Sequence, residues 1–394
     1  MRAIAVVGLL SILGAPALPA GIYGTIQTTD GREVTGTIRW DRNEVFWDDV
    51  LDAQKTAVAD LPAEPEPEGL RLNVLGWKLD LGDRRGRAWG LTVPFGNIRS
   101  IEREGDGARI ELQGGGTIEA VGHGSTDLGP SLRSVVVRAP DGAETELAWP
   151  EIARVWLREG PDESRRDGER LYGTLRLRDG SSLTGFVSLD KNLALTTDSV
   201  RGGGRVDAGE VGLGDVRSLV RRVGGRAAVV PRAADAADPT ATEVEISNVD
   251  LAVPGVGHAG IDWDDCERLD FAPAPASPRY DSFGGRRIRG TVETVDGAAH
   301  AGKIVWDMDE AWTFEAVDGR AGEVYWSVPF DSIDSIEPRG RDAAKLVLRG
   351  GSELVLSGTH DVNQDNRGIL VIEDGGLTHE IEWGDLRKVT VSRP

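Results

Sequence analysis

The sequence contains a single cysteine, Cys266, among its 394 residues. One cysteine excludes an intrachain disulfide, so burial of the core must hold the fold together. The thiol follows Asp264 and Asp265, and neighbouring carboxylates raise a thiol pKa and suppress the reactive thiolate. We therefore expect Cys266 to be a core or half-buried residue and not a nucleophile.

Basic residues are also scarce, because 45 Lys and Arg stand against 65 Asp and Glu, giving a formal net charge of −20. A polyanion would be repelled by this charge, which argues against nucleic acid as the main partner. An anionic membrane surface is disfavoured for the same reason. Cationic proteins and divalent cations are favoured, and the alternative is that the charge only solvates the surface.

Long apolar runs with a helical period are missing. Only 39% of the residues are hydrophobic, whereas glycine is abundant, with 52 residues. Short alternating stretches are separated by Asp-Gly, Gly-Gly and Pro turns, which is typical of many short strands. The sequence therefore predicts an all-β protein, long enough for two to four ordinary domains.

Catalytic motifs are absent as well. The five histidines show no H-x-x-x-H spacing, and neither a G-x-S-x-G nucleophile elbow nor a G-x-x-x-x-G-K-[ST] phosphate loop occurs. A pair of carboxylates for glycoside hydrolysis stays open in a chain with 65 acids, although nothing singles out one pair. We expect a non-enzymatic protein.

The amino terminus has the pattern of a secretory signal peptide over residues 1–20. A charged start at Arg2 precedes an apolar stretch from Ala3 to Gly14, and small residues up to Ala20 offer a cleavage site. The alternative is an uncleaved anchor, although the apolar stretch is shorter than the roughly 20 residues that span a bilayer. We expect an exported protein, periplasmic or extracellular, that touches a membrane only through an uncleaved amino terminus.

Three stretches of the chain align without gaps over 18 residues. They read GTIQTTDGREVTGTIRWD from Gly24, GTLRLRDGSSLTGFVSLD from Gly173, and GTVETVDGAAHAGKIVWD from Gly290. The Asp-Gly pair in each predicts the tight turn of a hairpin. A second glycine is shared by the three stretches, at Gly36, Gly185 and Gly302. It falls inside a strand, where glycine commonly marks a bulge or a sharp bend.

A second phrase, here called the closing motif, occurs six times. It has apolar residues at the first, third, sixth and ninth positions, which predicts a strand, one 3₁₀ turn and a short final strand. The six copies are VPFGNIRSIE from Val93, LAWPEIARVWL from Leu147, VGLGDVRSLV from Val211, IDWDDCERLDF from Ile261, VPFDSIDSIE from Val328 and IEWGDLRKVTV from Ile381. Six closing motifs predict six small barrels arranged as three pairs.

The hairpins and closing motifs together resemble the Sm-like and SH3-like small β-barrels, and also the PRC-barrel. The pattern is also similar to tandem-repeat exported proteins of bacteria that have no assigned activity. The resemblance covers most of residues 21–393 and implies a fold and not a function. The RNA-binding loops of Sm proteins are not matched, because the corresponding loops are acidic here.

The repeats divide the chain into three segments. We expect the first segment at residues 21–158, with an acidic Pro/Glu insertion at 51–88, the second segment at 170–272 and the third segment at 285–394. A charged linker at 159–169 and a Pro-rich linker at 273–284 separate them.

Carboxylates after the second strand of the hairpin are the first candidate site. In the third segment they are Asp307, Asp309 and Glu310, and the first segment has Asp41 and Glu44 at matching positions. Carboxylates that converge at a strand end could bind Ca²⁺ through oxygen ligands. The alternative is that Asp41 and Asp307 only cap the turn that follows the strand, as in an Asx turn.

The loop from Asp361 to Gly368 is the second candidate. Asp361, Asn363 and Asp365 have the spacing of the first three ligands of an EF-hand loop, although Asn366 stands where that loop needs Gly. The bidentate Glu is also missing, because Ile372 occupies its position. The alternative is a loop of Asx turns ordered by Arg367. Ca²⁺ is therefore the only cofactor considered.

Tryptophan is the most frequent aromatic residue, with eleven copies. Trp149, Trp263 and Trp383 occupy one position of the closing motif, and we expect them in the core or in contacts between barrels. Trp47, Trp312 and Trp326 follow no such pattern. Beside acidic residues they could stack on a sugar or dock a partner protein.

These features favour an exported repeat protein that scaffolds or binds another component of the cell envelope, for example as an accessory subunit of a membrane-bound assembly. A Ca²⁺- or carbohydrate-binding module is the alternative. A carboxylate-based hydrolase is a third reading.

Overall fold

The computed structural model describes residues 21–41, 43–59, 61, 71–74, 77–80, 89–122, 126–161, 168–201, 210–233 and 242–393. These residues form an all-β structure of short strands and single-turn 3₁₀ helices, as predicted. The expected signal peptide lies outside the described residues. So do the Pro/Glu tract at 62–68 and the alanine-rich stretch at 234–241.

In the first segment the elements are β1 (Tyr23–Thr28), β2 (Glu33–Trp40), β3 (Val50–Lys55), β4 (Arg71–Val74), β5 (Trp77–Asp80), β6 (Trp89–Pro94), η1 (Phe95–Asn97), β7 (Ile98–Glu104), β8 (Gly107–Leu112), β9 (Thr117–Val121), η2 (Gly129–Ser131), β10 (Val135–Arg138), β11 (Glu144–Leu147), η3 (Trp149–Glu151) and β12 (Ile152–Leu157). The second segment contains β13 (Tyr172–Leu177), β14 (Ser182–Leu189), β15 (Ser199–Arg201), β16 (Glu210–Gly212), η4 (Leu213–Asp215), β17 (Val216–Arg222), β18 (Arg226–Pro231), β19 (Glu243–Glu245), β20 (Asn248–Val253), β21 (Gly257–Asp262), η5 (Trp263–Asp265) and β22 (Cys266–Ala272).

After η6 (Tyr280–Ser282), the third segment contains β23 (Arg289–Thr294), β24 (Ala299–Val305), β25 (Ala316–Ala321), β26 (Val324–Pro329), η7 (Phe330–Ser332), β27 (Ile333–Pro338), β28 (Ala343–Leu348), β29 (Glu353–Ser357), η8 (His360–Val362), β30 (Ile369–Ile372), β31 (Thr378–Ile381), η9 (Trp383–Asp385) and β32 (Leu386–Val391). No helix among the described residues is long and apolar enough to cross a membrane.

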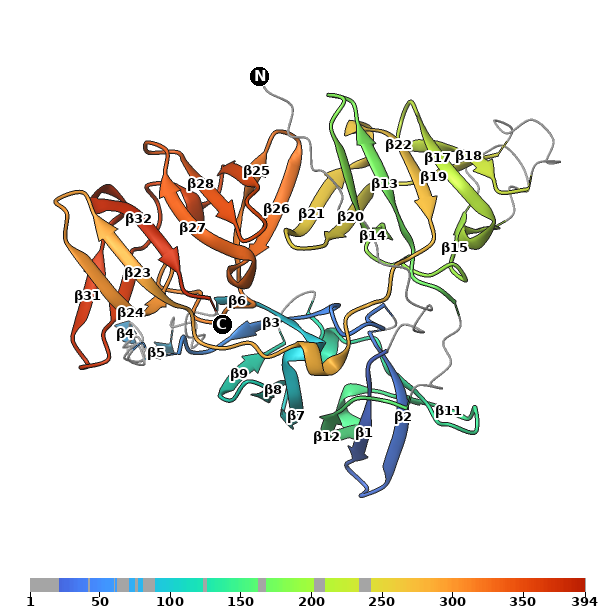
Figure 1. The fold of residues 1–394 in the computed structure, drawn as a ribbon. Coiled ribbons are helices and arrows are strands. Elements are labelled where there is room, and N and C mark those ends of the chain that lie inside the picture. The colour runs from blue at the N-terminus through green and yellow to red at the C-terminus, as the bar shows by residue number, and fades with distance from the viewer. Residues whose placement is uncertain are drawn as a thin grey trace.

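Two large antiparallel sheets carry the fold. Ten strands of the first segment form one sheet, and the other sheet runs through the second and third segments, which are joined where β21 pairs with β26 (Figure 1). Neither sheet closes on itself within the described residues, so the expected small barrels are not seen as closed barrels. In Figure 1 the three segments surround a centre where β3 and β6 approach the third segment.

The three aligned stretches form hairpins of identical register. Gly24 pairs with Gly36, Gly173 with Gly185, and Gly290 with Gly302. The turn glycines have the left-handed backbone that the Asp-Gly pairs predict, with φ of 87° at Gly31, 87° at Gly180 and 90° at Gly297. The predicted hairpins are confirmed at all three positions.

The glycines inside the second strands are needed for close approach and not for a bulge. A Cβ on Gly36 would lie 2.0 Å from the carbonyl oxygen of Arg138, and one on Gly302 would lie 2.1 Å from that of Ile372. The pairing with the preceding strand runs through these glycines without a shift, so the expected bulge there is wrong. The shifts occur elsewhere, for example between Gln27 and Thr28 where β1 pairs with β12.

All six closing motifs form a strand, a single 3₁₀ turn and a further strand, as predicted. The turns are η1, η3, η4, η5, η7 and η9. In each segment the final strand of the second closing motif pairs on both sides, and β12 therefore joins β1 to β7. The strands β22 and β32 do the same in the second and third segments. This strand therefore connects, within each segment, the strand of the hairpin to the strand of the first closing motif.

The core is built around tryptophans at repeated positions. Trp149, Trp263 and Trp383 are buried, as expected, and each donates its indole N–H to a backbone carbonyl. In the first segment Trp149 packs edge-on against Trp40, with ring centroids 6.5 Å apart. Cys266 is fully buried, and burial together with Asp265 raises its pKa to about 12, in agreement with a core thiol.

Residues between the second and third segments pack on the first segment. The ring of Tyr280 lies 4.6 Å from that of Trp47, and its hydroxyl donates to the carbonyl of Ile98. The Oδ1 of Asn97 accepts hydrogen bonds from the backbone N–H of Gly284 and Gly285. These contacts fix the entry of the third segment beside the first, which sets the position of the site described next.

Candidate functional site

An acidic cavity of about 690 Å³ lies between β6 of the first segment and the third segment. Gly90, Leu91 and Thr92 form one wall. The third segment contributes six carboxylates and one imidazole, from Asp309, Glu310, Glu315, Asp318, Asp361, Asp365 and His360. Such an excess of carboxylates in one cavity favours a cation.

The turn after β24 places the first group of acids. The chain reverses tightly, with hydrogen bonds from the N–H of Asp309 and of Glu310 to the carbonyl of Trp306. Asp307 has φ of 48° and Met308 has φ of 53°, so the turn is left-handed at both residues. Asp309 and Glu310 consequently face the cavity while Asp307 is fully buried.

Asp307 binds a distant part of the chain and not its own turn. Its carboxylate accepts the backbone N–H of Arg367, and the Arg367 guanidinium donates to Oδ2 at 2.8 Å. His360 Nδ1 contacts the same oxygen. The expectation that Asp307 only caps its own turn is therefore wrong, and two cations already neutralise this carboxylate.

Lys55 of β3 supplies a buried cation to the cavity wall. Its ammonium lies 2.8 Å from Asp309 Oδ1, donates to the carbonyl of Asp309 at 2.8 Å, and contacts Glu315. Burial alone would lower the pKa of Lys55, but Glu315 and Asp309 outweigh that effect and raise it. Glu315 also accepts the N–H groups of Ala311 and Trp312, which fixes the turn.

Glu310 has no such cation. Its Oε2 is inaccessible to solvent and has no hydrogen-bond partner, unlike most buried polar atoms. Burial, followed by repulsion from Asp361 and Asp309, raises the pKa of Glu310 well above its ordinary value. Burial thus favours the protonated form of Glu310, and a cation in the cavity would favour its ionised form.

The loop from Asp361 to Asp365 forms the far side of the cavity. Asn363 Oδ1 accepts the N–H of Asp365 at 2.7 Å, which is the Asx turn expected as the alternative to an EF-hand. Asp361 is buried and accepts the N–H of Asp318 at 2.8 Å, while its carbonyl accepts the indole N–H of Trp306. Arg367 contacts Asp307 and Asp309 and leaves Asn363 and Asp365 to their local turn.

Asp318 on β25 completes the acidic lining. It accepts the hydroxyl proton of Ser327 at 2.5 Å, and Tyr325 on the neighbouring strand also bonds to it. Burial is the main cause that raises the pKa of Asp318 to about 6. This carboxyl therefore titrates near neutrality, in a range where cation binding and proton release are coupled.

The first segment carries a matching group of acids outside the cavity. Asp41 is paired with Arg133, whose Nη2 lies 2.9 Å away, as Asp307 is with Arg367. The indole of Trp40 donates to the carbonyl of Asp127, as Trp306 does to Asp361. Burial raises the pKa of Glu44 to about 9, and its Oε2 also lacks a partner.

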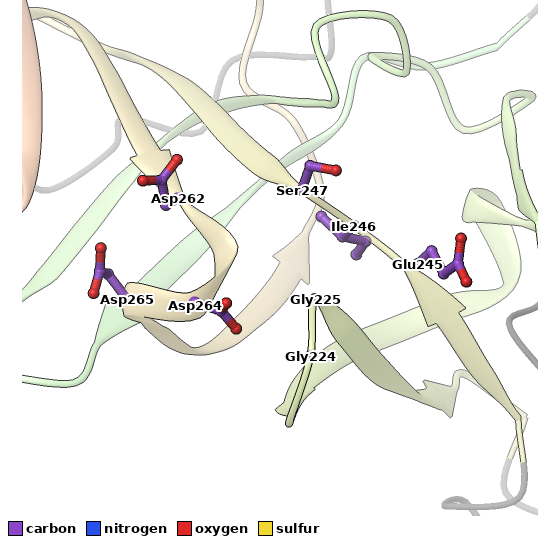
Figure 2. Close-up of a pocket in the computed structure, with 8 residues that line it drawn as sticks. All are labelled: Gly224, Gly225, Glu245, Ile246, Ser247, Asp262, Asp264 and Asp265. Carbon is purple, nitrogen blue, oxygen red and sulfur yellow. The ribbon is translucent and has the colours of Figure 1, made fainter.

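A second cavity, of about 450 Å³, lies in the second segment. Its acids are Asp262 at the end of β21, Asp264 and Asp265 in η5, and Glu245 on β19 (Figure 2). Figure 2 shows the Glu245 side chain apart from the three aspartates. No buried unpaired side-chain atom is found among these acids in the described structure, in contrast to Glu310.

The three tryptophans expected at an interaction surface are buried within the chain. Trp47 packs against Tyr280, and Trp326 lies on β26 where it pairs with Ala259 of β21. Trp312 stacks with Phe314 and reaches the first segment so closely that a Cβ on Gly116 would lie 2.4 Å from its ring. In the structure these side chains fill contacts between segments.

Of the six predicted metal-site residues, five line one cavity, namely Asp309, Glu310, Asp361, Asn363 and Asp365. Sequence reasoning missed Lys55, Glu315, Asp318 and His360. One signal was available, because Glu315 follows Asp307 by the same eight residues that separate Asp49 from Asp41 and Asp198 from Asp190. Glu315, Asp49 and Asp198 each accept two backbone N–H groups of their own turn.

Lys55 carried no signal, since it lies in the residues expected to form an insertion. The structure instead places it at the end of the core strand β3. The chain matches no protein-family model, no curated protein and no solved structure.

Proposed function

We propose that this protein is an exported, non-enzymatic binding protein that scaffolds another component of the cell envelope by holding a cationic side chain of that partner in the acidic cavity. Its three tandem segments are proposed to be related to the SH3-like and Sm-like small barrels, although their sheets are not closed. The single observation that carries the proposal is the excess of carboxyl groups in the cavity, whose lining has six of them, two paired with Lys55, and one imidazole.

The contacts of Lys55 support an ammonium or guanidinium as the group recognised. Lys55 is held by two carboxylates and a backbone carbonyl at one wall, which is a complete set of partners for a buried ammonium. Glu310, Asp318 and Asp361 line the same cavity and do not contact Lys55 in the described structure. A second cation of the same kind would find carboxylate acceptors there.

The size and the protonation of the cavity agree with that ligand. A volume of about 690 Å³ is within the range of roughly 300–1,000 Å³ of small-ligand sites, so a Lys or Arg side chain fits. A bound cation favours the ionised form of Asp318 and Glu310, so binding releases protons. Affinity for a cation should therefore fall as the pH drops below about 6, the pKa of Asp318.

The first test is calorimetry of the full chain with a tri-lysine peptide. We expect one-to-one binding that is weaker at pH 5 than at pH 7.5 and at least tenfold weaker in Glu310→Gln and Asp318→Asn. Glu44→Gln is the matched control, because Glu44 is a similar buried acid outside the cavity. Equal affinities in all three variants would place the peptide elsewhere and remove the cavity from the proposal.

The second test addresses the partner. Tagged wild-type protein and the Glu310→Gln variant are used for affinity purification from the envelope of the native host in mild detergent. The proposal expects an envelope protein that is retained by the wild type and by Glu44→Gln and lost with Glu310→Gln. A fractionation in which the protein stays in the cytoplasm would contradict the export expected from residues 1–20.

Ca²⁺ or carbohydrate binding remains the alternative. Asn363 and Asp365 face the cavity and offer the oxygen ligands that Ca²⁺ prefers. Calorimetric heat with CaCl₂ and none with the peptide, abolished by Asp365→Asn, would replace the proposal with a Ca²⁺ site. Hits on a glycan array that the cavity variants lose would replace it with a carbohydrate site.

A carboxylate-based hydrolase is favoured by one observation, the raised pKa values of Glu310 and Asp318 in a shared cavity. Enzymes use such shifts to keep one carboxyl protonated as a general acid. Turnover of chromogenic glycosides that is lost in Glu310→Gln and kept in Glu44→Gln would establish this activity.

A further inference from the structure

Two histidines and a glutamate meet on the outer half of the third segment. His300 lies on β24, His379 lies on β31, and Glu373 begins the turn that joins β30 to β31. The strand β30 lies between the other two, pairing Lys303 with Ile372 and Val371 with His379. The sheet register thus brings together residues that are up to 79 positions apart, which no local spacing in the sequence reveals.

The donor atoms of these residues converge on one point. His379 Nε2 lies 3.1 Å from Glu373 Oε1, and His300 Nδ1 lies 3.7 Å from the same oxygen. The two imidazole rings stack, with centroids 3.8 Å apart and planes inclined by 29°. The three donor atoms all lie within 4.8 Å of one another.

The two separations from Glu373 are close to those between ligands of a tetrahedral ion. With metal–ligand bonds of about 2.0–2.1 Å, two ligands of a tetrahedral Zn²⁺ are about 3.3 Å apart. The observed 3.1 and 3.7 Å lie on either side of that value. Two imidazoles and one carboxylate are also a donor set that Zn²⁺ and its neighbours in the first transition row prefer over Ca²⁺ or Mg²⁺.

The alternative, a hydrogen-bonded cluster without a metal, accounts for less of the geometry. Glu373 can accept from His379 at 3.1 Å, but 3.7 Å to His300 is too long for a hydrogen bond. Protonating both stacked rings to pair them with one carboxylate would set two positive charges against each other. A single ion uses all three donors at once.

The supporting structure holds Glu373 in place. Its backbone N–H donates to the carbonyl of Leu377, and its carbonyl accepts from Gly376, whose φ is 83°. The nearby Asp374 is paired with Arg289 and is not among the converging donors. The three ligand side chains are half-buried, with 21%, 25% and 34% of their surface exposed for His300, His379 and Glu373.

The other groups with converging donors are less suited to a metal. In the group of Asp307, His360 and Asp361, the carboxylate of Asp307 is already paired with Arg367, and in the third group Asp41 is paired with Arg133. A guanidinium stays protonated and positively charged, so it would repel a metal ion at either place. The group on β24 and β31 has no guanidinium on its carboxylate in the described structure.

We propose that His300, Glu373 and His379 bind a divalent transition-metal ion, with Zn²⁺ as the expected occupant. Three protein ligands leave one tetrahedral position for water or for a donor atom of another molecule. This site is separate from the acidic cavity and does not depend on the function proposed for it.

The test is titration of the metal-free full chain with Co²⁺ and with Zn²⁺. We expect a one-to-one Co²⁺ complex with the strong visible absorption of tetrahedral coordination, displaced by Zn²⁺. His300→Ala, His379→Ala and Glu373→Gln should each weaken Zn²⁺ binding at least tenfold. The matched control His360→Ala, which removes a histidine from another acidic group, should leave the affinity unchanged.

Glu373→Gln keeps the size of the side chain, and far-UV circular dichroism verifies that each variant is folded. The proposal is overturned if Glu373→Gln, folded, binds Zn²⁺ as tightly as the wild type. It is also overturned if His360→Ala weakens binding as much as His379→Ala does, or if Co²⁺ gives only the weak absorption of octahedral coordination.

Discussion

The ammonium of Lys55 lies 2.8 Å from the Oδ1 of Asp309, although 254 residues separate them in the chain. Both side chains are buried, Lys55 to 3% exposure. The pair joins a core strand of the first segment to the turn that shapes the cavity of the third. The packing of the first segment against the third therefore supplies the positive charge that compensates Asp309 and Glu315.

Removing the cation should destabilise the protein strongly. In Lys55→Met, Asp309 and Glu315 lose their partner inside the structure, and an uncompensated buried charge costs about 3–5 kcal/mol. Chemical denaturation at pH 7 measures the loss in the free energy of unfolding. Arg226→Ala is the control, because its pair with Glu243 is half-exposed and should contribute less than about 1 kcal/mol.

A second variant separates charge from packing. Adding Glu315→Gln to Lys55→Met removes one of the two stranded carboxylates and should recover part of the lost stability. A loss below about 1 kcal/mol in Lys55→Met would mean that the ion pair is hydrated and not buried as described.

Glu44 should make the protein less stable as the pH rises. Its pKa is raised to about 9 in the folded chain from an ordinary 4.5, chiefly by burial. Between these values the folded state binds more protons than the unfolded state, so stability decreases with pH, by up to about 1.4 kcal/mol per pH unit. Unfolding of wild type and Glu44→Gln from pH 5 to 9 measures this, and the advantage of the variant should grow with pH.

The pH range provides its own control in that experiment. Near pH 5 the carboxyl is protonated in the folded chain, so Glu44→Gln should differ little from the wild type there. A constant difference between the two proteins at every pH would attribute the effect to packing and contradict the proton linkage.

His360 should titrate far above an ordinary histidine. A hydrogen bond with Asp361 is the main cause that raises its pKa to about 9, and Asp307 adds to it. The raised pKa contributes stability that is complete below about pH 6.5 and is lost as the pH rises through 9. The imidazole signals in a ¹H–¹³C spectrum of the full chain should show a midpoint near 9.

Asp361→Asn tests the cause of that shift. The midpoint of His360 should move down toward about 6.5, the ordinary value for histidine. His258 on β21 has a pKa lowered chiefly by desolvation, and it gives the comparison signal within the same spectrum. A midpoint of His360 near 6.5 in the wild-type protein would contradict the described contacts with Asp307 and Asp361.

Gly36→Ala should destabilise the first hairpin. The added methyl would lie 2.0 Å from the carbonyl oxygen of Arg138, so β2 and β10 would have to separate. Overpacking of this kind typically costs about 1–3 kcal/mol. Thermal and denaturant unfolding measure the cost, and Gly185→Ala and Gly302→Ala should behave alike because their surroundings are the same.

Gly350 offers the matched control for those glycines. A Cβ there meets nothing within 4 Å and its backbone is not left-handed, so Gly350→Ala should be neutral or stabilise by up to about 1 kcal/mol. Similar losses at Gly36 and Gly350 would show that the close approach is not what requires glycine.

Local features of the fold were predictable because their causes are local. An Asp-Gly pair needs only its own backbone to turn, so the hairpins at Gly31, Gly180 and Gly297 were predicted correctly. The closing motif likewise contains its own 3₁₀ turn and its own buried positions. The reason for glycine at Gly36 was not predicted correctly. The carbonyl oxygen that comes close to it belongs to Arg138, which lies far along the chain and is brought near only by folding.

The candidate site was predictable only in part. Asp309, Glu310 and Asp361 were singled out by residue type, and the cavity does bring them together. The cations that pair with Asp309 were not foreseeable, since Lys55 and Arg367 reach it across distances in sequence that no spacing rule covers. The same holds for His300 and His379, which meet only through the register of β24, β30 and β31.

By itself the sequence determined the all-β class, the three hairpins, the six closing turns and the core positions of Trp149, Trp263 and Trp383, because turn chemistry and alternating burial act over a few residues. Only the tertiary structure decided which carboxylates are paired with a cation, which are not, and which histidines converge. Charge interactions depend on distance in space, and in a β-protein that distance is set by strand pairing and by the packing of one segment on another.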